Sequence, residues 1–471
     1  MPEIRRAMRL EDIYKTISPE PLRTKEDLDA YYRVEINELR GPDKIRLMKL
    51  GLERAFGSLP YKAFLMGHSG VGKSTEITRL INEVTDKYQA IRFSATAELD
   101  PINFQPFDIL LLMMAELVER TAKPREEGGA GAKPSDDRLK EIWDWFATET
   151  ETRKKAEEKS ARLSAGVGPD AESWWAKAVG LFASLKGEMK FASARETKVV
   201  TYRLSRLSDL IEAANRLVLD CNGLLRKAVR KEWLIIGEDF DKAGIPLQGP
   251  ENLFVTYGNV IKNLGAHMIF VIPITLGYSS RAGQFPVPSD HVHILPDTPV
   301  FEKDHKPHTK GRASVRAVLE ARMSLDLFGA GQLERVIVAS GGNLRDLFTL
   351  IAQASDLAIL REAPQGRIGE DDVSAAIQSL RTEYERRLGE NPYETPQVSY
   401  EDKAKRLVRI YKNEPESDTT DAVLYSLLRS RAVQEFNGER WFGVHPLVVD
   451  VLVSHERIPR RKKGSVPGGT R

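Results

Sequence analysis

The sequence predicts an α/β fold, in which a parallel sheet core is followed by smaller helical units. Three observations predict it. An apolar run from Ala63 to Met66 is typical of a buried strand and leads directly into a glycine-rich loop. A second apolar run, Trp233 to Ile236, ends in carboxylates. From Val315 onward, hydrophobic residues recur at helical spacing. Short buried strands separated by helical patterns favour a parallel sheet.

The loop after the first strand carries a specific motif. Gly67, Gly72, Lys73 and Ser74 fit G-x-x-x-x-G-K-[ST] without a gap, and a helical pattern follows. Strand, glycine loop and helix is the context that confirms a P-loop. The predicted phosphate-binding residues are Gly67, His68, Ser69, Gly70, Val71, Gly72, Lys73, Ser74 and Thr75. The alternative is a glycine-rich turn that binds nothing.

The residue types explain this chemistry. The glycines let the backbone turn tightly and bring its N–H groups against phosphate oxygens. The helix that opens near Lys73 adds the positive end of its dipole. Lys73 reaches the β- and γ-phosphates, and the Ser74 hydroxyl is a ligand for Mg²⁺. ATP and Mg²⁺ are therefore the expected cofactors, and neither His68 nor Ser69 is assigned a catalytic role.

The strand from Trp233 to Gly237 runs into Glu238 and Asp239, with Asp241 close behind. This is the pattern of a Walker B strand, which places acids where Mg²⁺ and the attacking water sit. Ser74 and Glu238 are the predicted metal ligands. The long spacing from Lys73 is explained by an insertion from about Thr121 to Glu196.

The bulk numbers restrict the class of protein. The chain has 471 residues, enough for about three domains. Net charge is +2, so no global basic field indicates a nucleic-acid binder. Cys221 is the only cysteine, which excludes a disulfide framework and a cysteine-rich zinc site. No signal peptide opens the chain, and its longest apolar stretch is too short to span a bilayer. We expect a cytoplasmic protein without membrane contact.

Composition and periodicity divide the chain into five parts. The predicted parts are a helical lead-in at 1–60, a core at 61–300 with a helical insertion at about 121–196, a helical lid at 301–390, a winged helix at 398–456 and a basic tail at 457–471. The winged helix is predicted because two helical patterns precede two short apolar runs that flank an Asn-Gly turn at 437–438. Within the insertion, Trp174 and Trp175 open an amphipathic patch that serves either local packing or a partner.

Three further strands are expected at Tyr88–Ser94, His267–Thr275 and His291–Leu295. Thr275 is polar at the carboxyl end of its strand, which faces the nucleotide crevice if the sheet is parallel. Arg281 lies beyond it, and Arg345 occupies the first turn of a helix after the Gly341-Gly342 turn.

In this order, the pieces resemble AAA+ ATPases of the origin-recognition and STAND-like branch. The resemblance covers roughly Tyr61 to Val453, and its P-loop motif is the specific part. It implies that Glu238 and Asp239 form the Walker B pair, and that Thr275 and Arg345 are sensors 1 and 2. Arg281 matches the place of a trans arginine finger. The family usually has Asp before Glu, so the order Glu238-Asp239 leaves the identity of the base open and predicts slow turnover.

Three functions remain open from the sequence. The first is a regulatory ATPase switch that acts through a partner protein, as in bacterial antiphage defence or signalling. The second is a DNA-binding initiator or loader that uses the winged helix, although acidic Glu435 and Glu439 argue against strong DNA affinity. The third is a nucleotide-dependent scaffold without hydrolysis. The partner, the trigger and the oligomeric state, including a homo-oligomer, are not fixed by the sequence.

Overall fold

The structure is a computed structural model that describes residues 5–147, 174–191, 195, 197–242, 244–362, 366–391, 394, 396–436 and 441–459. The chain forms two compact units. Unit 1 contains Met1–Asp43, Gly67–Thr75 and Leu295–Arg471, and unit 2 contains Lys44–Met66 and Glu76–Ile294. The phosphate loop is thus grouped with the C-terminal half, whereas the strand before it belongs to unit 2. The domain boundaries expected from the sequence stay predictions.

Unit 2 is built on a five-stranded parallel sheet with the order β2-β3-β4-β1-β5. Its strands are β1 (Lys62–Met66), β2 (Tyr88–Ser94), β3 (Glu232–Glu238), β4 (His267–Val271) and β5 (Val292–Ile294). Every residue of β3 and β4 is buried, as expected of parallel strands covered on both faces. β4 and β5 are shorter than predicted, so Thr275 lies past the strand in the short helix α15.

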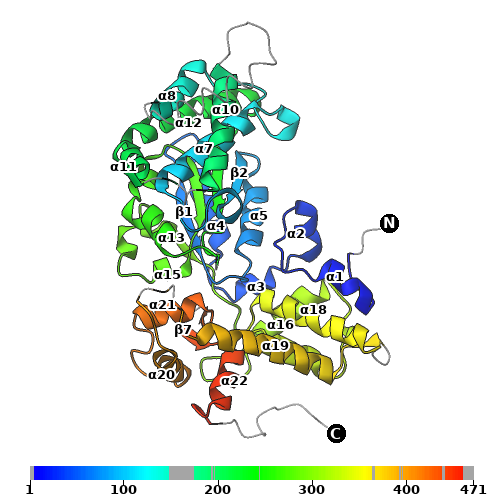
Figure 1. Ribbon diagram of the computed structural model, residues 1–471. Helices are drawn as coiled ribbons and strands as arrows, with labels where there is room; N and C mark the ends of the chain where they lie inside the picture. The colour runs from blue at the N-terminus through cyan, green and yellow to red at the C-terminus, as the bar shows by residue number, and fades with distance from the viewer. Residues whose placement is uncertain are drawn as a thin grey trace. The chain divides into compact units, whose positions relative to one another are not determined.

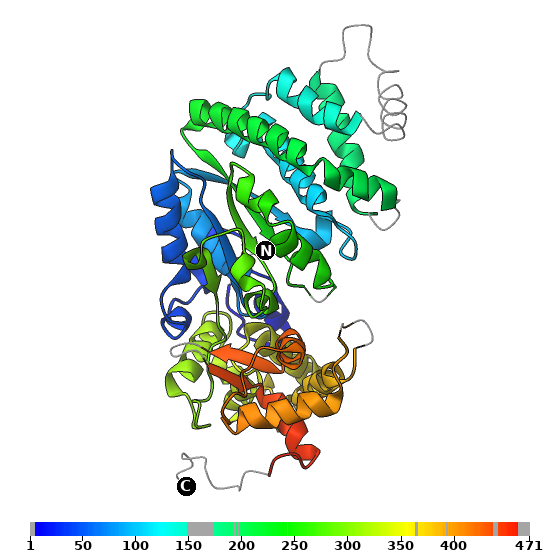
Figure 2. The same ribbon diagram turned by 90° about the vertical axis from the view of Figure 1, so that its left-hand side faces the viewer.

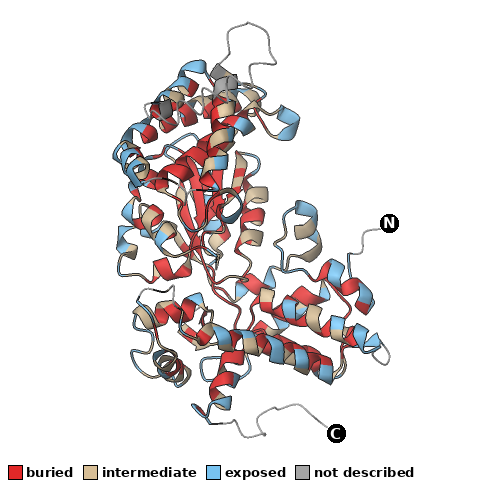
Figure 3. Cartoon of the chain, viewed as in Figure 1, coloured by how far each residue is buried: buried red, intermediate tan, exposed pale blue. Residues whose placement is uncertain are grey.

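Helices cover the sheet of unit 2, and the strands form its buried centre (Figures 1 and 3). These helices are α4 (Lys44–Ala55), most of α5 (Lys73–Val84), α6 (Ala95–Glu98), α7 (Pro106–Ala122), α8 (Asp136–Ala147), α10 (Trp174–Met189), α11 (Thr197–Ser205), α12 (Leu207–Val229), α13 (Gln248–Glu251), α14 (Asn259–Asn263) and α15 (Ile274–Gly277). The hydrophobic pattern from Thr201 to Arg230 predicts one long amphipathic helix, but the structure divides it at Arg206 into α11 and α12.

The insertion packs into the core of unit 2. Helix α7 is buried on nearly all sides; α10 and α12 pack against it, and α8 packs against α10 and α12 (Figure 1). The predicted patch also includes Val179 and Phe182. Phe182 is buried in this cluster, which supports local packing for that part of the patch, whereas Val179 is exposed. Residues 148–173 of the insertion lie outside the described residues.

Unit 1 combines short N-terminal helices with the C-terminal half of the chain. Its elements are η1 (Leu10–Asp12), α1 (Ile13–Thr16), α2 (Lys25–Tyr31), α3 (Glu35–Glu38), α16 (Thr309–Glu320), α17 (Gln332–Ala339), α18 (Leu344–Leu360), α19 (Glu370–Leu388), α20 (Tyr400–Tyr411), α21 (Ala422–Arg429), β6 (Val433–Phe436), β7 (Trp441–Val444) and α22 (Pro446–Ser454). Helices α18 and α19 run side by side, and Ser355 of α18 donates a hydrogen bond to the Leu10 carbonyl (Figure 1).

The last part of unit 1 has the element order that the sequence predicted. Helices α20 and α21 precede the antiparallel pair β6–β7, and α22 follows (Figure 2). The predicted hairpin is therefore present, although its turn at 437–439 and the tail from 460 lie outside the described residues. Within the described parts of the chain, no helix is both long and apolar enough to cross a bilayer.

Candidate functional site

The phosphate loop has the backbone shape that its glycines allow. Gly67, Gly70 and Gly72 have φ values of 148°, 95° and 101°, a region that residues with a side chain rarely adopt. A Cβ atom at Gly70 would collide with the side chains of Asn343 and Arg345. Glycine is therefore required at position 70 both for the turn and for the close approach of the beginning of α18 (Leu344–Leu360).

Lys73 lies at the first position of α5 and is buried. Its Nζ donates to the carbonyl oxygens of Gly67, at 2.7 Å, and His68, at 2.8 Å. Both acceptors belong to the loop itself, so the ammonium is held over the loop. A lysine in this place presents a point charge to an anion that the loop encloses.

The side chain of His68 ties the loop to the chain just beyond β5. His68 Nδ1 lies 2.8 Å from Asp297 Oδ2, and both side chains are buried. Although burial opposes it, the neighbouring His68 and Asn343 hold the pKa of Asp297 below its ordinary value. Asp297 is thus an ionised anchor, and His68 has a structural role in the loop.

A second anchor comes from the beginning of α18. Asn343 caps this helix, because its Oδ1 accepts from the backbone N–H groups of Arg345 and Asp346. Its Nδ2 donates to the Ser69 carbonyl at 3.0 Å and to Asp297 at 3.2 Å. Two residues later, Arg345 NH1 donates to the Ser69 hydroxyl. The helix that the sequence placed in a lid therefore begins directly against the phosphate loop.

Arg431, just before β6, reaches the same point. Its NH1 lies 3.4 Å from the Ser69 carbonyl oxygen and 3.0 Å from Asp346 Oδ1. Asp346 also accepts from the Tyr384 hydroxyl at 2.5 Å. Burial opposes the ionised form, but Arg431 and His445 hold the pKa of Asp346 far below its ordinary value. This is a buried ion pair with its hydrogen bonds satisfied, and such pairs have a defined geometry.

In unit 2, the predicted Walker B glutamate ends β3. Glu238 is buried, and its Oε1 accepts from Arg92 Nε at 2.7 Å. Arg92 lies on the neighbouring strand β2, and its NH1 donates to Thr78 of α5 at 2.9 Å. A guanidinium and a carboxylate form a charge-assisted pair with a defined geometry. Glu238 is therefore held in an ion pair at the carboxyl end of β3.

Asp239 follows with a φ of 69°, which is uncommon outside glycine. Its Oδ2 accepts from the Ser94 hydroxyl at 2.6 Å, and Lys242 Nζ lies 3.5 Å from its Oδ1. Backbone strain of this kind persists where surrounding contacts enforce it, and it is concentrated at functional sites. Asp239 is less buried than Glu238, with about a sixth of its side chain exposed.

The other two predicted residues of unit 2 have separate environments. Thr275 is buried in α15. Arg281 is half-exposed, and its NH1 donates to Glu251 at 2.8 Å while its NH2 reaches Thr256 at 3.3 Å. Thr256 ends a π-helical turn at Asn252–Thr256, a rare feature that is frequent at functional sites. Arg281 is thus held at the surface of unit 2 by an ion pair and a hydrogen bond.

The residues of the loop fit a triphosphate. Successive N–H groups in a left-handed turn, a buried lysine and a helix N-terminus form an anion-binding concavity. Arg345 and Arg431 add two cations at Ser69. Ser74 lies in the first turn of α5, where its hydroxyl suits Mg²⁺. The chain has the fold of a P-loop ATPase.

Comparison with known proteins adds distant structural likenesses. No protein-family model matches the chain, and no curated protein matches it. It is similar to the solved structures of the Aeropyrum pernix ORC2 protein, Cdc6p from Pyrobaculum aerophilum and a Walker-type ATPase of Pyrococcus abyssi. The identities are 11, 12 and 13%, and each TM-score is 0.38. The matches cover 90, 96 and 94% of this chain and 98, 100 and 100% of those chains. The predicted α/β core with a parallel sheet and a P-loop is confirmed.

The structure also adds residues that the sequence did not single out. Asn343, Asp297 and Arg431 contact the phosphate loop, and Arg92 holds Glu238. Two of them carried a sequence signal. Arg92 is a lone charge inside an alternating strand, and Asn343 follows a Gly-Gly turn at the beginning of a helix. Asp297 and Arg431 had none, because both come to the loop through long-range folding.

Proposed function

We propose that this protein is an ATP-binding and slowly ATP-hydrolysing AAA+ switch that regulates a partner protein. One observation carries the proposal. Asn343, Arg345 and Arg431 come from α18 and from the segment before β6, and all three contact Ser69 of the phosphate loop. A loop that only stored nucleotide would not need its conformation to be held by the C-terminal elements.

The switch works through a difference in binding. The γ-phosphate distinguishes ATP from ADP, and a guanidinium binds phosphate through paired hydrogen bonds. Arg345 is bound to the Ser69 hydroxyl, so it is close enough to exchange this neutral partner for an anion. Only a ligand that binds one conformation better than another shifts their populations. Arg345 and Arg431 therefore favour the ATP-bound conformation of unit 1.

Two carboxylates at the end of β3 are proposed to act in hydrolysis: Glu238, the last residue of the strand, and Asp239, which follows it. Glu238 is paired with Arg92, and Asp239 is held by Ser94. Mg²⁺ bound with ATP would supply charge neutralisation for the phosphoryl group. A base that must first leave an ion pair predicts slow turnover, which suits a switch better than a motor. Thr275 and Arg281 keep their proposed roles as sensor 1 and arginine finger.

The wider role is part of the same proposal. The elements α20 to α22 are proposed to form the winged helix, and the partner is proposed to be a protein in a cytoplasmic defence or signalling system. DNA binding and self-association stay predictions.

The proposal is tested by calorimetry with ATP and ADP in the presence of Mg²⁺, together with a steady-state assay of phosphate release. The parent should bind ATP and release phosphate slowly. Lys73→Ala should lose ATP binding or weaken it severely, because the triphosphate loses a principal cation. Lys227→Ala changes an exposed lysine of α12 and should bind as the parent does. ATP binding by Lys73→Ala equal to the parent's would refute the P-loop assignment.

A further inference from the structure

Unit 1 contains a cavity of about 520 Å³ that is separate from the phosphate loop. It is bordered by the hairpin β6–β7, the segment 300–305 and the helices α17, α20 and α22. None of the residues Gly67–Thr75 lines it. Ligand cavities in proteins span about 300–1,000 Å³, so this one has the size of a small-molecule site.

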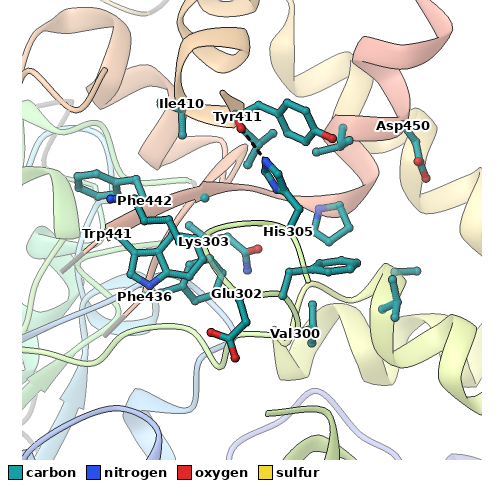
Figure 4. Close-up of a pocket in the computed structure, with 18 of the residues that line it drawn as sticks. Val300, Glu302, Lys303, His305, Ile410, Tyr411, Phe436, Trp441, Phe442 and Asp450 are labelled. Carbon is teal, nitrogen blue, oxygen red and sulfur yellow. Dashed lines mark hydrogen bonds between the residues drawn. The ribbon is translucent and has the colours of Figure 1, made fainter. Parts of the chain in front are cut away.

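Flat rings form the walls of this cavity. Five aromatic side chains line it: Phe301, Tyr411, Phe436, Trp441 and Phe442. The His305 ring stacks on Tyr411 with centroids 4.3 Å apart, and Phe436 packs against Trp441 at 4.6 Å (Figure 4). Aromatic rings prefer offset-stacked or edge-on partners. A planar ring system is the ligand shape that such walls accommodate.

Aliphatic side chains complete the lining and leave apolar surface to be covered. Val338 of α17 and Val449 of α22 line the cavity and are only partly buried, and so is Trp441. A ligand that removes this apolar surface from water gains binding free energy through the hydrophobic effect. Four charged residues also line the cavity: Glu302, Lys303, Arg335 and Asp450. Glu302 and Asp450 appear at separate places around the cavity in Figure 4. Arg335 is engaged by Gln332 and Ser374.

We propose that this cavity binds a small planar aromatic molecule, and that its occupancy is coupled to the nucleotide state of the phosphate loop. The coupling, but not the binding site itself, rests on the proposed ATP binding. The physical link is strand β6. Arg431 stands just before the strand and reaches Ser69, whereas Phe436 at its far end lines the cavity.

Between Arg431 and Phe436, Gln434 contacts both the cavity and the turn that precedes Asn343. It lines the cavity, and its Nε2 donates to the Gly341 carbonyl at 3.1 Å, two residues before Asn343. Gln434 and Phe436 lie on the same face of the strand because side chains alternate. A ligand that moves Phe436 therefore acts on an element tied at two points to the loop region. By linkage, ATP must change the ligand's affinity by the same factor.

The binding site is tested with 1-anilinonaphthalene-8-sulfonate, an aromatic probe with a planar naphthalene ring system, by fluorescence titration and calorimetry of the full chain without nucleotide. We expect saturable binding at one site. Val449→Phe and Val338→Phe each fill the cavity from a different helix and should weaken probe binding at least tenfold. Val179→Phe adds the same volume at a partly exposed valine of α10 and should bind like the parent.

Two controls keep this result specific. The unfolding midpoint of each variant shows whether it is folded, and the two filling variants come from separate helices, so one folded variant is sufficient. Lys73→Ala should bind the probe as the parent does, because the phosphate loop does not line the cavity. Non-saturable binding, unweakened binding in a folded filling variant, or loss of binding in Lys73→Ala would overturn the site.

Coupling is measured by titrating ATP with and without saturating probe, and probe with and without saturating ATP. We expect each to shift the other's affinity by the same factor, at least threefold in either direction. Unchanged affinities in both titrations would overturn the coupling. If the chain binds no ATP, the proposed function fails while the nucleotide-free titration still decides the site.

Discussion

Asn343 Nδ2 lies 3.0 Å from the carbonyl oxygen of Ser69, while the Oδ1 of the same amide caps α18. A single side chain thus fixes the beginning of a helix and the conformation of the phosphate loop. An aspartate or serine could cap the helix equally well. The amide supplies the acceptor for the helix and the donor for the loop on two separate atoms.

Asn343→Ser separates these two tasks. Serine keeps the cap, but the bonds from the amide nitrogen to the Ser69 carbonyl and to Asp297 are both lost, so stability should fall by about 1–3 kcal/mol. Since one hydrogen bond contributes about 1 kcal/mol, ATP affinity should fall several-fold. Ser399→Ala removes the cap of α20 and is the matched control, expected to lower stability without changing ATP affinity. Calorimetry with ATP measures the affinity, and urea unfolding measures the stability. Unchanged ATP affinity in Asn343→Ser would show that the hydrogen bond from Asn343 to the Ser69 carbonyl does not contribute to ATP binding.

Arg345→Ala should narrow the gap between ATP and ADP affinity. The guanidinium is bound to the Ser69 hydroxyl and can meet a γ-phosphate that ADP lacks. Any ATP-dependent change in protease sensitivity at 390–398 should weaken as well. Arg367→Ala alters an exposed arginine of unit 1 as a control. Calorimetry gives the two affinities, and an unchanged ratio with an unchanged cleavage pattern would make Arg345 a structural residue.

Glu238→Gln and Asp239→Asn, made separately, should retain ATP binding and slow hydrolysis. Loss of a positioned base costs about 10²–10⁴-fold in rate. Asn tolerates the positive φ of position 239, so that variant should keep the parent's stability. Gln at 238 leaves Arg92 without its carboxylate partner and should lower the unfolding midpoint. Single-turnover rates identify the base, and near-parental rates in both variants would point to Asp241.

The parts of the fold that follow local rules were predicted from the sequence. The P-loop, the Walker B strand and the hairpin of β6–β7 each depend on residues that are adjacent in the chain. The break at Arg206 was not predicted, because the hydrophobic period continues across it. The contacts of the loop with Asp297 and Arg431 depend on tertiary folding. They join residues 229 and 362 positions apart, and no local pattern encodes such pairs.

Acid should destabilise unit 2 through His293. Its side chain is buried in β5, and its Nε2 has no hydrogen-bond partner among the described residues. Burial lowers the pKa of His293 to about 4, with Lys44 and His291 adding to the effect. The unfolded chain takes up this proton near pH 6.5, whereas the folded chain resists it until about pH 4. Stability is therefore retained above about pH 6.5 and falls as the pH drops toward 4.

His293→Leu should remove this part of the pH dependence. Between pH 7.5 and pH 5.0, the parent should lose about 2 kcal/mol more stability than the variant. Urea unfolding at the two pH values measures the difference. His455→Gln, at an exposed histidine of unit 1, serves as the control and should follow the parent. Parallel pH profiles for the parent and His293→Leu would show that His293 is not the group responsible.

Arg431→Lys should uncouple the hairpin from the phosphate loop while leaving unit 1 folded. The arginine NH1 faces Asp346 at 3.0 Å and the Ser69 carbonyl at 3.4 Å. Asp346 is buried and ionised, so complete removal of the cation would leave an unpaired buried charge, which costs about 3–5 kcal/mol. A lysine keeps that charge but lacks the planar fork. We expect it to remain with Asp346, because a carboxylate attracts a cation more strongly than a carbonyl does.

The variant should then unfold near the parent's midpoint and show a smaller preference for ATP over ADP. Arg429→Lys, at an exposed arginine two residues earlier, should change neither property. If Arg431→Lys kept the parent's preference for ATP over ADP, the contact between Arg431 and Ser69 would have only a structural role. The hairpin would then have no part in distinguishing ATP from ADP.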